Sequence, residues 1–108
     1  MPDAAILVLT HLPDRARAEK LAQALVAGRL AACVSVGAPV LSMYHWREQF
    51  ETAQEVPLVI KTRQSLYGEV EAAILREHPY ELPEIVAVPL IDGFSPYLEW
   101  IAAETAPR

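Results

Sequence analysis

The chain has 108 residues, of which 53% are hydrophobic and only 7% aromatic, a composition typical of an aliphatic globular protein. At this length we expect one compact domain, residues 1–108, that buries roughly 65% of the surface of its unfolded form. Fourteen acidic and nine basic residues give a net charge of −5. This sign disfavours binding to phosphate backbones, so we expect no nucleic-acid partner.

The sequence predicts neither a membrane span nor an export signal. No apolar run reaches the roughly 18 residues that cross a bilayer, and the N-terminal "MPDAAILVLT" lacks the basic start of a signal peptide. Cys33 is the single cysteine and has no partner for an internal disulfide, in keeping with a reducing compartment. We therefore expect a cytoplasmic protein without membrane contacts.

The first half of the chain predicts a strand, a helix and a long second strand. The β-rich apolar run at residues 4–10 predicts a strand buried on both faces. Asp14 is expected to cap a helix with apolar residues at helical spacing, and Gly28 to close it in the left-handed conformation. Residues 30–46 are too β-branched for a second helix, and "GAP" at 37–39 divides them into two collinear strand halves joined by a bulge.

The second half predicts a strand, a helix, a strand and a short terminal helix. After the polar turn "REQ", residues 55–62 form a returning strand in which Pro57 marks an edge or a bulge. Helical periodicity runs through 64–77, and an apolar strand is expected at 84–90. The final segment "SPYLEWIAAET" predicts a helix with Ser95 as its cap and a proline at its first position.

The order β-α-β-β-α-β with an added C-terminal helix predicts an α+β fold. Right-handed crossovers of two β-α-β halves give an antiparallel sheet of order 4-1-3-2 with both long helices on one face, the ferredoxin-like sandwich. The second and third strands extend past the first and fourth, and this overhang leaves backbone groups and apolar side chains in water. The apolar side chains are Val40, Leu41, Met43, Tyr44, Trp46 and Phe50. We expect another chain to cover them.

Five separated motifs carry a family resemblance: "AACVSV", "YHW", "VIKT", "HPYELPEIVAVP" and "YLEWI". From Ala5 to about Ala102 the chain resembles the divalent-cation tolerance family, CutA. The resemblance implies a ferredoxin-like subunit in a tight homotrimer, similar to the trimeric PII signalling proteins. It also implies tolerance of copper and other divalent cations, metal binding, and no established catalytic reaction. Leu12 stands where many relatives carry a cysteine, which removes a soft metal ligand, and the hairpin "WREQF" lacks the common glycine.

The segment "HPYELPEI", His78 to Ile85, is the richest in reactive groups. Pro79 and Pro83 stiffen its backbone, and this rigidity is by itself a sufficient structural explanation. The functional alternative is a cleft between subunits that binds a metal, holds a small anion or passes protons. The cleft candidates are Cys33, Trp46, Lys61, His78, Tyr80, Glu81 and Glu84. Trp46 and Trp100 are equally explained as interface and core anchors.

A metal site has no local signature in this sequence, because no two cysteines or histidines lie at ligand spacing. The candidate ligands are His78 and Cys33, and they predict weak binding of Cu(II) or Zn(II) that folding does not require. Cys33 is otherwise expected to be a small buried hydrophobe. His11 and His45 are interpreted as solvent-facing or loop histidines.

Two classes of function follow from these patterns. The first is a non-catalytic trimeric binding or signalling module in metal homeostasis, with divalent metal ions as ligands and no catalytic residue. The alternative is an uncharacterised enzyme, or a sensor of a small anion or metabolite, that uses the cleft between subunits. RNA recognition is disfavoured because the strand "EVPLVIKT" lacks paired aromatic residues.

Overall fold

The computed structural model describes residues 3–106. The elements are β1 (Ala5–Leu12), α1 (Arg15–Ala27), β2 (Cys33–Val36), β3 (Val40–Trp46), β4 (Gln49–Arg63), a short 3₁₀ helix (Gln64–Leu66), α2 (Tyr67–Glu77), β5 (Ile85–Pro89) and α3 (Ser95–Glu104). One sheet holds β2, β4, β1 and β5 in that order, β3 pairs with β4, and every pairing is antiparallel. The predicted α+β fold with a single antiparallel sheet is confirmed.

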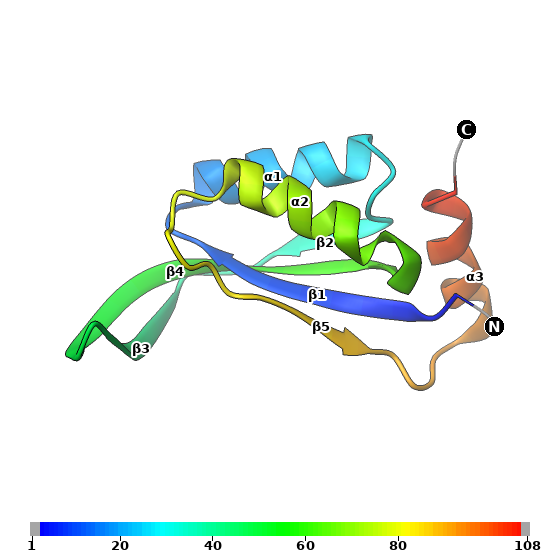
Figure 1. Cartoon of the computed structure of the whole chain (residues 1–108). Coiled ribbons are helices and arrows are strands. Elements are labelled where there is room, and N and C mark those ends of the chain that lie inside the picture. Colours follow the sequence, from blue (N-terminus) through cyan, green and yellow to red (C-terminus); the bar gives the residue numbers. More distant parts are fainter. Residues whose placement is uncertain (1–2, 107–108) are drawn as a thin grey trace.

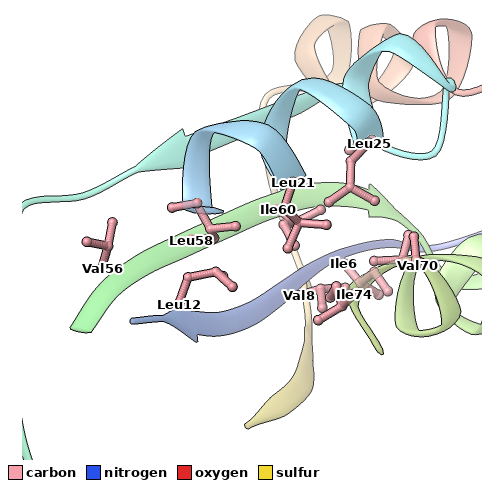
Figure 2. Packing of buried hydrophobic residues seen from close by; sticks show 13 residues of the cluster. Ile6, Val8, Leu12, Leu21, Leu25, Val56, Leu58, Ile60, Val70 and Ile74 are labelled. Atoms are coloured by element: carbon pink, nitrogen blue, oxygen red, sulfur yellow. The ribbon is translucent and has the colours of Figure 1, made fainter. Parts of the chain in front are cut away.

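The core lies between the sheet and the helices α1 and α2, which cover the same face (Figures 1 and 2). Alternate residues of β1 and β4 point toward these helices, as the two-residue period of a strand requires. The fully buried side chains include Val8, Leu12, Leu21, Leu25, Leu58, Ile60, Val70 and Ile74. Each contributes about 1.5–3 kcal/mol by leaving water. The expectation that the first strand is buried on both faces is wrong, because both long helices pack on one side and the other face of β1 is only half-buried.

The N-terminal cap of α1 is confirmed, whereas the left-handed residue at its C-terminal end is Arg29 and not the expected Gly28. The Asp14 carboxylate accepts a hydrogen bond from the Arg17 backbone N–H at 2.8 Å, as a cap should. Gly28 ends the helix with φ −83°, so its expected left-handed conformation is wrong. Arg29 takes that conformation with φ 63°, which directs the next backbone N–H, that of Leu30, to the Leu25 carbonyl at 3.0 Å.

The last helix is held across the end of the sheet by Arg63, the last residue of β4. Ser95 is the first helical residue and Phe94 precedes it as the N-cap, so the expected Ser95 cap is wrong. At the other end of α3, Arg63 donates to the Thr105 carbonyl at 2.8 Å and to the Thr105 hydroxyl at 2.9 Å. The same guanidinium donates to Asp3 at 2.9 Å, so it joins three parts of the chain.

The strand β4 is a single 15-residue strand that pairs first with β3 and then with β2. The second strand begins at Cys33 rather than at residue 30, and the expected strand 55–62 begins earlier, at Gln49. The Pro57 carbonyl accepts a hydrogen bond from the Gly37 N–H at 2.9 Å. Because the N–H and C=O of one strand residue point to the same neighbour, the donor that Pro57 lacks would face the break between β2 and β3.

The hairpin of β3 and β4 projects beyond the body of the molecule (Figure 1). Its extension makes the chain 44 Å long and only 26 and 23 Å across, with a radius of gyration of 14.5 Å against roughly 13 Å for a compact domain of this length. Leu41, Met43 and Phe50 are each about 60% exposed on it. The predicted overhang of apolar side chains is therefore present in the single chain.

Candidate functional site

A cleft of about 640 Å³ lies between the β3–β4 hairpin and the segment that joins α2 to β5. In Figure 1 this segment is the yellow stretch that follows α2. The cleft is lined by His11, Ser42, Met43, Tyr44, His45, Trp46, Glu55, Tyr80, Glu81, Leu82 and Glu84. Two regions far apart in the sequence thus bring three carboxylates and three aromatic side chains to one cavity.

Glu55 and Tyr80 form a hydrogen-bonded pair in the lining of the cleft. Glu55 is only 9% exposed. Burial of the Tyr80 ring and its hydrogen bond to Glu55 raise the pKa of the Tyr80 hydroxyl to about 12. The phenol therefore keeps its proton at physiological pH and donates to the Glu55 carboxylate.

His78 lies behind Tyr80 and is held by the backbone through both ring nitrogens. Its Nε2 lies 2.6 Å from the His11 carbonyl oxygen, and its Nδ1 accepts a hydrogen bond from the Tyr80 N–H at 3.2 Å. These two partners require the neutral ring with the proton on Nε2. The His78 and Tyr80 rings are also in contact, with centroids 4.7 Å apart. A metal ion at His78 would have to displace one of the two backbone bonds.

The rim of the cleft carries two further ionic contacts. His11 Nδ1 lies 3.4 Å from a Glu84 carboxylate oxygen. Glu81 pairs with Arg47, and the Arg47 guanidinium carbon lies 5.1 Å from the centre of the Trp46 ring. Of the cleft candidates taken from the sequence, the structure thus brings together Trp46, Tyr80, Glu81 and Glu84.

Lys61 and Cys33 lie elsewhere on the uncovered face of the sheet. The Lys61 ammonium is 3.8 Å from the Cys33 sulfur and 3.4 Å from the Ser35 hydroxyl. Lys61 is four residues, or roughly 13 Å of strand, beyond Pro57, which pairs with His11 at the cleft. Cys33 is half-buried, and the expectation of a core cysteine is wrong because its neighbour in the strand, Val34, takes the side that packs on the core.

Sequence reasoning missed Glu55 and Tyr44 as cleft residues. The available signal was the two-residue period of β4, since Val56 and Leu58 face the helices and Glu55 must therefore face the open side. Within residues 3–106, no group of three or more His, Cys, Asp or Glu side chains is placed to hold a metal ion. In the same part of the chain, none of the helices has the length and apolar character that a membrane span needs.

Comparison with known sequences identifies relatives along almost the whole chain. The model of the CutA1 divalent ion tolerance protein family matches residues 6–104. The divalent-cation tolerance protein CutA of Thermus thermophilus is 36% identical over 99 residues, which cover 92% of this chain and 96% of that protein. The chloroplastic protein CutA of Arabidopsis thaliana is 37% identical over 100 residues, 93% of this chain, but the chain spans only 55% of its length.

Solved structures of the same family superpose on the chain. CutA from Xylella fastidiosa has a TM-score of 0.92 at 37% identity, with coverage of 95% of this chain and 99% of that one. The periplasmic divalent cation tolerance protein CutA from Archaeoglobus fulgidus has a TM-score of 0.91 at 30% identity, with coverage of 94% and 99%. The resemblance of the sequence motifs is confirmed, and the chain belongs to the CutA1 divalent ion tolerance family.

Proposed function

We propose that this protein is a homotrimeric divalent-cation tolerance protein, a binding or signalling module of metal homeostasis in the cytoplasm. Family membership supports the role in cation tolerance. The observation that carries the proposal is the projecting hairpin, whose exposed apolar side chains and single-sided pairing with β4 call for a second chain. The function thus depends on an assembly.

Three copies satisfy this surface better than two. Besides the hairpin, the outer strand β5 exposes Val86 and Val88 by 47% and 42%. A two-fold dimer pairs one edge of each sheet and leaves the other in water, whereas a closed ring repeats one contact and covers both edges. An interface of obligate size over such apolar surface makes dissociation inseparable from unfolding.

Light scattering coupled to size exclusion tests the assembly. We expect three times the chain mass of 11.9 kDa, unchanged on dilution to low micromolar concentration. A folded monomer under those conditions would remove the basis of the proposal.

The metal part of the proposal is weak binding of Cu(II) or Zn(II). His78 and Cys33 are the ligands proposed from the sequence, but both His78 nitrogens already have backbone partners. The geometry favours His11 with Glu84, which lie 3.4 Å apart on the cleft rim. Carboxylate and neutral imidazole are suitable ligands for both ions.

Metal titrations of wild type, His11→Ala, His78→Ala and Cys33→Ser separate these ligands. We expect His11→Ala to weaken Zn(II) binding most, Cys33→Ser to have little effect, and affinity to fall below about pH 6 as imidazole is protonated. Equal affinity of wild type and both histidine variants would place the metal outside the cleft.

We also propose that the protein catalyses no reaction. Lys61, a cleft candidate from the sequence that could act as a general acid or hold an anion, is far along β4 from the cleft. The three carboxylates of the cleft oppose a small anion. A thermal-shift screen of metal ions and metabolites tests this reading. Turnover of any stabilising metabolite would favour the enzyme instead.

A further inference from the structure

We propose that the cleft binds a small organic cation, a guanidinium or primary ammonium group on an aliphatic stem. The inference deepens the proposed function, because it names a ligand class for the same cleft and rests on that cleft being the binding site. Its volume of about 640 Å³ is in the range of small-molecule sites. Three features of the lining select a cation.

The first feature is the buried carboxylate of Glu55. The side chain is nine-tenths buried, and its hydrogen bond from Tyr80 uses one of about four acceptor positions of a carboxylate. Among residues 3–106, no basic side chain forms an ion pair with Glu55. Buried charges in proteins are normally paired, so the Glu55 carboxylate calls for a cation from outside the chain.

The second feature is the aromatic wall of the cleft. Tyr44, Trp46 and Tyr80 line it together with Met43. The faces of aromatic rings attract guanidinium and ammonium groups, and the thioether gives an aliphatic stem an apolar contact. A hydrated metal ion gains little from such a wall, whereas a cation with an apolar stem gains from both parts.

The third feature is a guanidinium that this chain itself places at the rim. Arg47 lies 5.1 Å from the centre of the Trp46 ring and donates to both carboxylate oxygens of Glu81, at 3.0 Å to Oε1. Trp46 and Glu81 therefore already bind a guanidinium group, which is one of the two cationic groups named in the proposal. The Arg47 side chain is 69% exposed, so an incoming cation can displace it.

The remaining charged groups of the cleft agree with this assignment. Glu81 and Glu84 add two carboxylates at the rim, and the basic groups on the lining are the imidazoles of His11 and His45. The His11 ring already lies 3.4 Å from Glu84. Three carboxylates thus face the cleft, and this excess of acidic groups favours cations over anions.

The test uses the full chain with Trp100→Phe, so that Trp46 is the single tryptophan, and n-butylguanidinium as the probe. We expect a saturable change in Trp46 fluorescence, confirmed by calorimetry on the unmodified protein. The neutral n-butylurea, which has nearly the same shape, should produce no saturable change. Equal binding of the two compounds would overturn the proposal, because charge would then play no part.

Three variants locate the cation. Glu55→Gln keeps the shape of the side chain and should weaken n-butylguanidinium binding at least tenfold, whereas the control Glu69→Gln, on an exposed turn of α2, should leave it unchanged. Arg47→Ala should tighten binding severalfold by removing the internal competitor. Unchanged affinity in both Glu55→Gln and Arg47→Ala would reject this site. If Glu55→Gln does not fold, Arg47→Ala decides.

Three outcomes separate this inference from the proposed function. A trimer that binds Zn(II) but not n-butylguanidinium would overturn the inference alone. Binding of n-butylguanidinium by a folded monomer would overturn the trimer and leave the ligand class standing. If Glu55→Gln breaks the trimer and no probe binds, the cation beside Glu55 belongs to a neighbouring copy, and the free ligand is rejected.

Discussion

At the scale of single residues, Gly37 lies close to Pro57 in the β2–β3 connection, and its N–H donates to the Pro57 carbonyl. A Cβ atom on Gly37 would lie 2.8 Å from Cγ of the rigid Pro57 ring, whereas one on Gly68 would meet no atom within 4 Å. We therefore expect Gly37→Ala to lower the free energy of unfolding by about 1–3 kcal/mol. The matched Gly68→Ala, in α2, should raise it by about 0.5–1 kcal/mol.

Chemical denaturation at one fixed protein concentration measures both changes. The double variant Gly37→Ala/Pro57→Ala provides the control, since removal of the proline ring should recover most of the stability that the single Gly37→Ala change loses. A stabilising Gly37→Ala would show that the connection has room to move away from Pro57.

Tyr80 gives the cleft a measurable alkaline signature. Burial and the Glu55 carboxylate raise its pKa from 10.0 to about 12 in the folded state. Between these values the folded chain binds a proton that the unfolded chain has lost, so this contribution to stability is complete below pH 10 and disappears as the pH rises toward 12. We expect wild type to lose stability more steeply than Tyr80→Phe over that interval.

Phenolate absorbance during an alkaline titration checks this expectation directly. Wild type should show one tyrosine that ionises near pH 12, and Tyr80→Phe should lack that step. Ionisation of all four tyrosines with no step near pH 12 would contradict the buried hydrogen bond to Glu55.

At the scale of elements, the turn of the hairpin has a backbone conformation that its two residues, Arg47 and Glu48, disfavour. Arg47 and Glu48 have φ values of 51° and 66°, the left-handed pair that joins two strands through a two-residue turn. Side chains other than Gly and Asn are strained there by about 1–2 kcal/mol. We expect Glu48→Gly to stabilise the protein by about 0.5–1 kcal/mol after the entropy of glycine is subtracted.

Glu51→Gly is the matched control, because Glu51 lies within β4, three residues after Glu48. It lies outside the residues with positive φ, so glycine there only weakens a strand and should lower the melting temperature. If the two changes shift the melting temperature equally, the backbone of the turn is not strained at Glu48.

Element types were predictable because they depend on local periodicity. The Asp14 cap was predictable because capping depends on residues that are close in the sequence. The errors occurred where the hydrogen bonds at a helix end and the docking of the helices decide. Arg29 rather than Gly28 adopts the left-handed conformation, because the following amides must reach the Leu25 carbonyl. The first strand is covered on one face only, a fact set by where the helices dock and not by its apolar sequence.

The site was predictable in part for a similar reason. Tyr80, Glu81 and Glu84 share one short motif, so finding that motif found all three. Glu55 lies in a different strand and reaches the cleft only through the pairing of β4 with β1 and β3. Lys61 sits on the same strand face as Glu55 but six residues away, and no local pattern in the sequence shows that this distance takes it out of the cleft.

At the scale of the whole molecule, the uncovered sheet face is the surface on which the proposed trimer depends. Val88 on β5 pairs with Leu7 and lies on the face opposite to the helices. We expect Val88→Glu to dissociate the trimer, because a charge would be buried in an apolar interface. Leu75→Glu is the matched control, since Leu75 is 52% exposed on the helix layer and its charge would stay in water. The mass in solution distinguishes the two variants.

The long strand β4 also provides a way to follow folding and assembly separately by hydrogen exchange. From Val56 to Arg63 it has β1 on one side, and β2 adds cover on the other, so these amides should exchange only when the chain unfolds as a whole. From Gln49 to Glu55, β3 is its one partner strand within residues 3–106. Amides that point away from β3 will be slow only when another chain protects them. One strand therefore reports unfolding at one end and subunit exchange at the other.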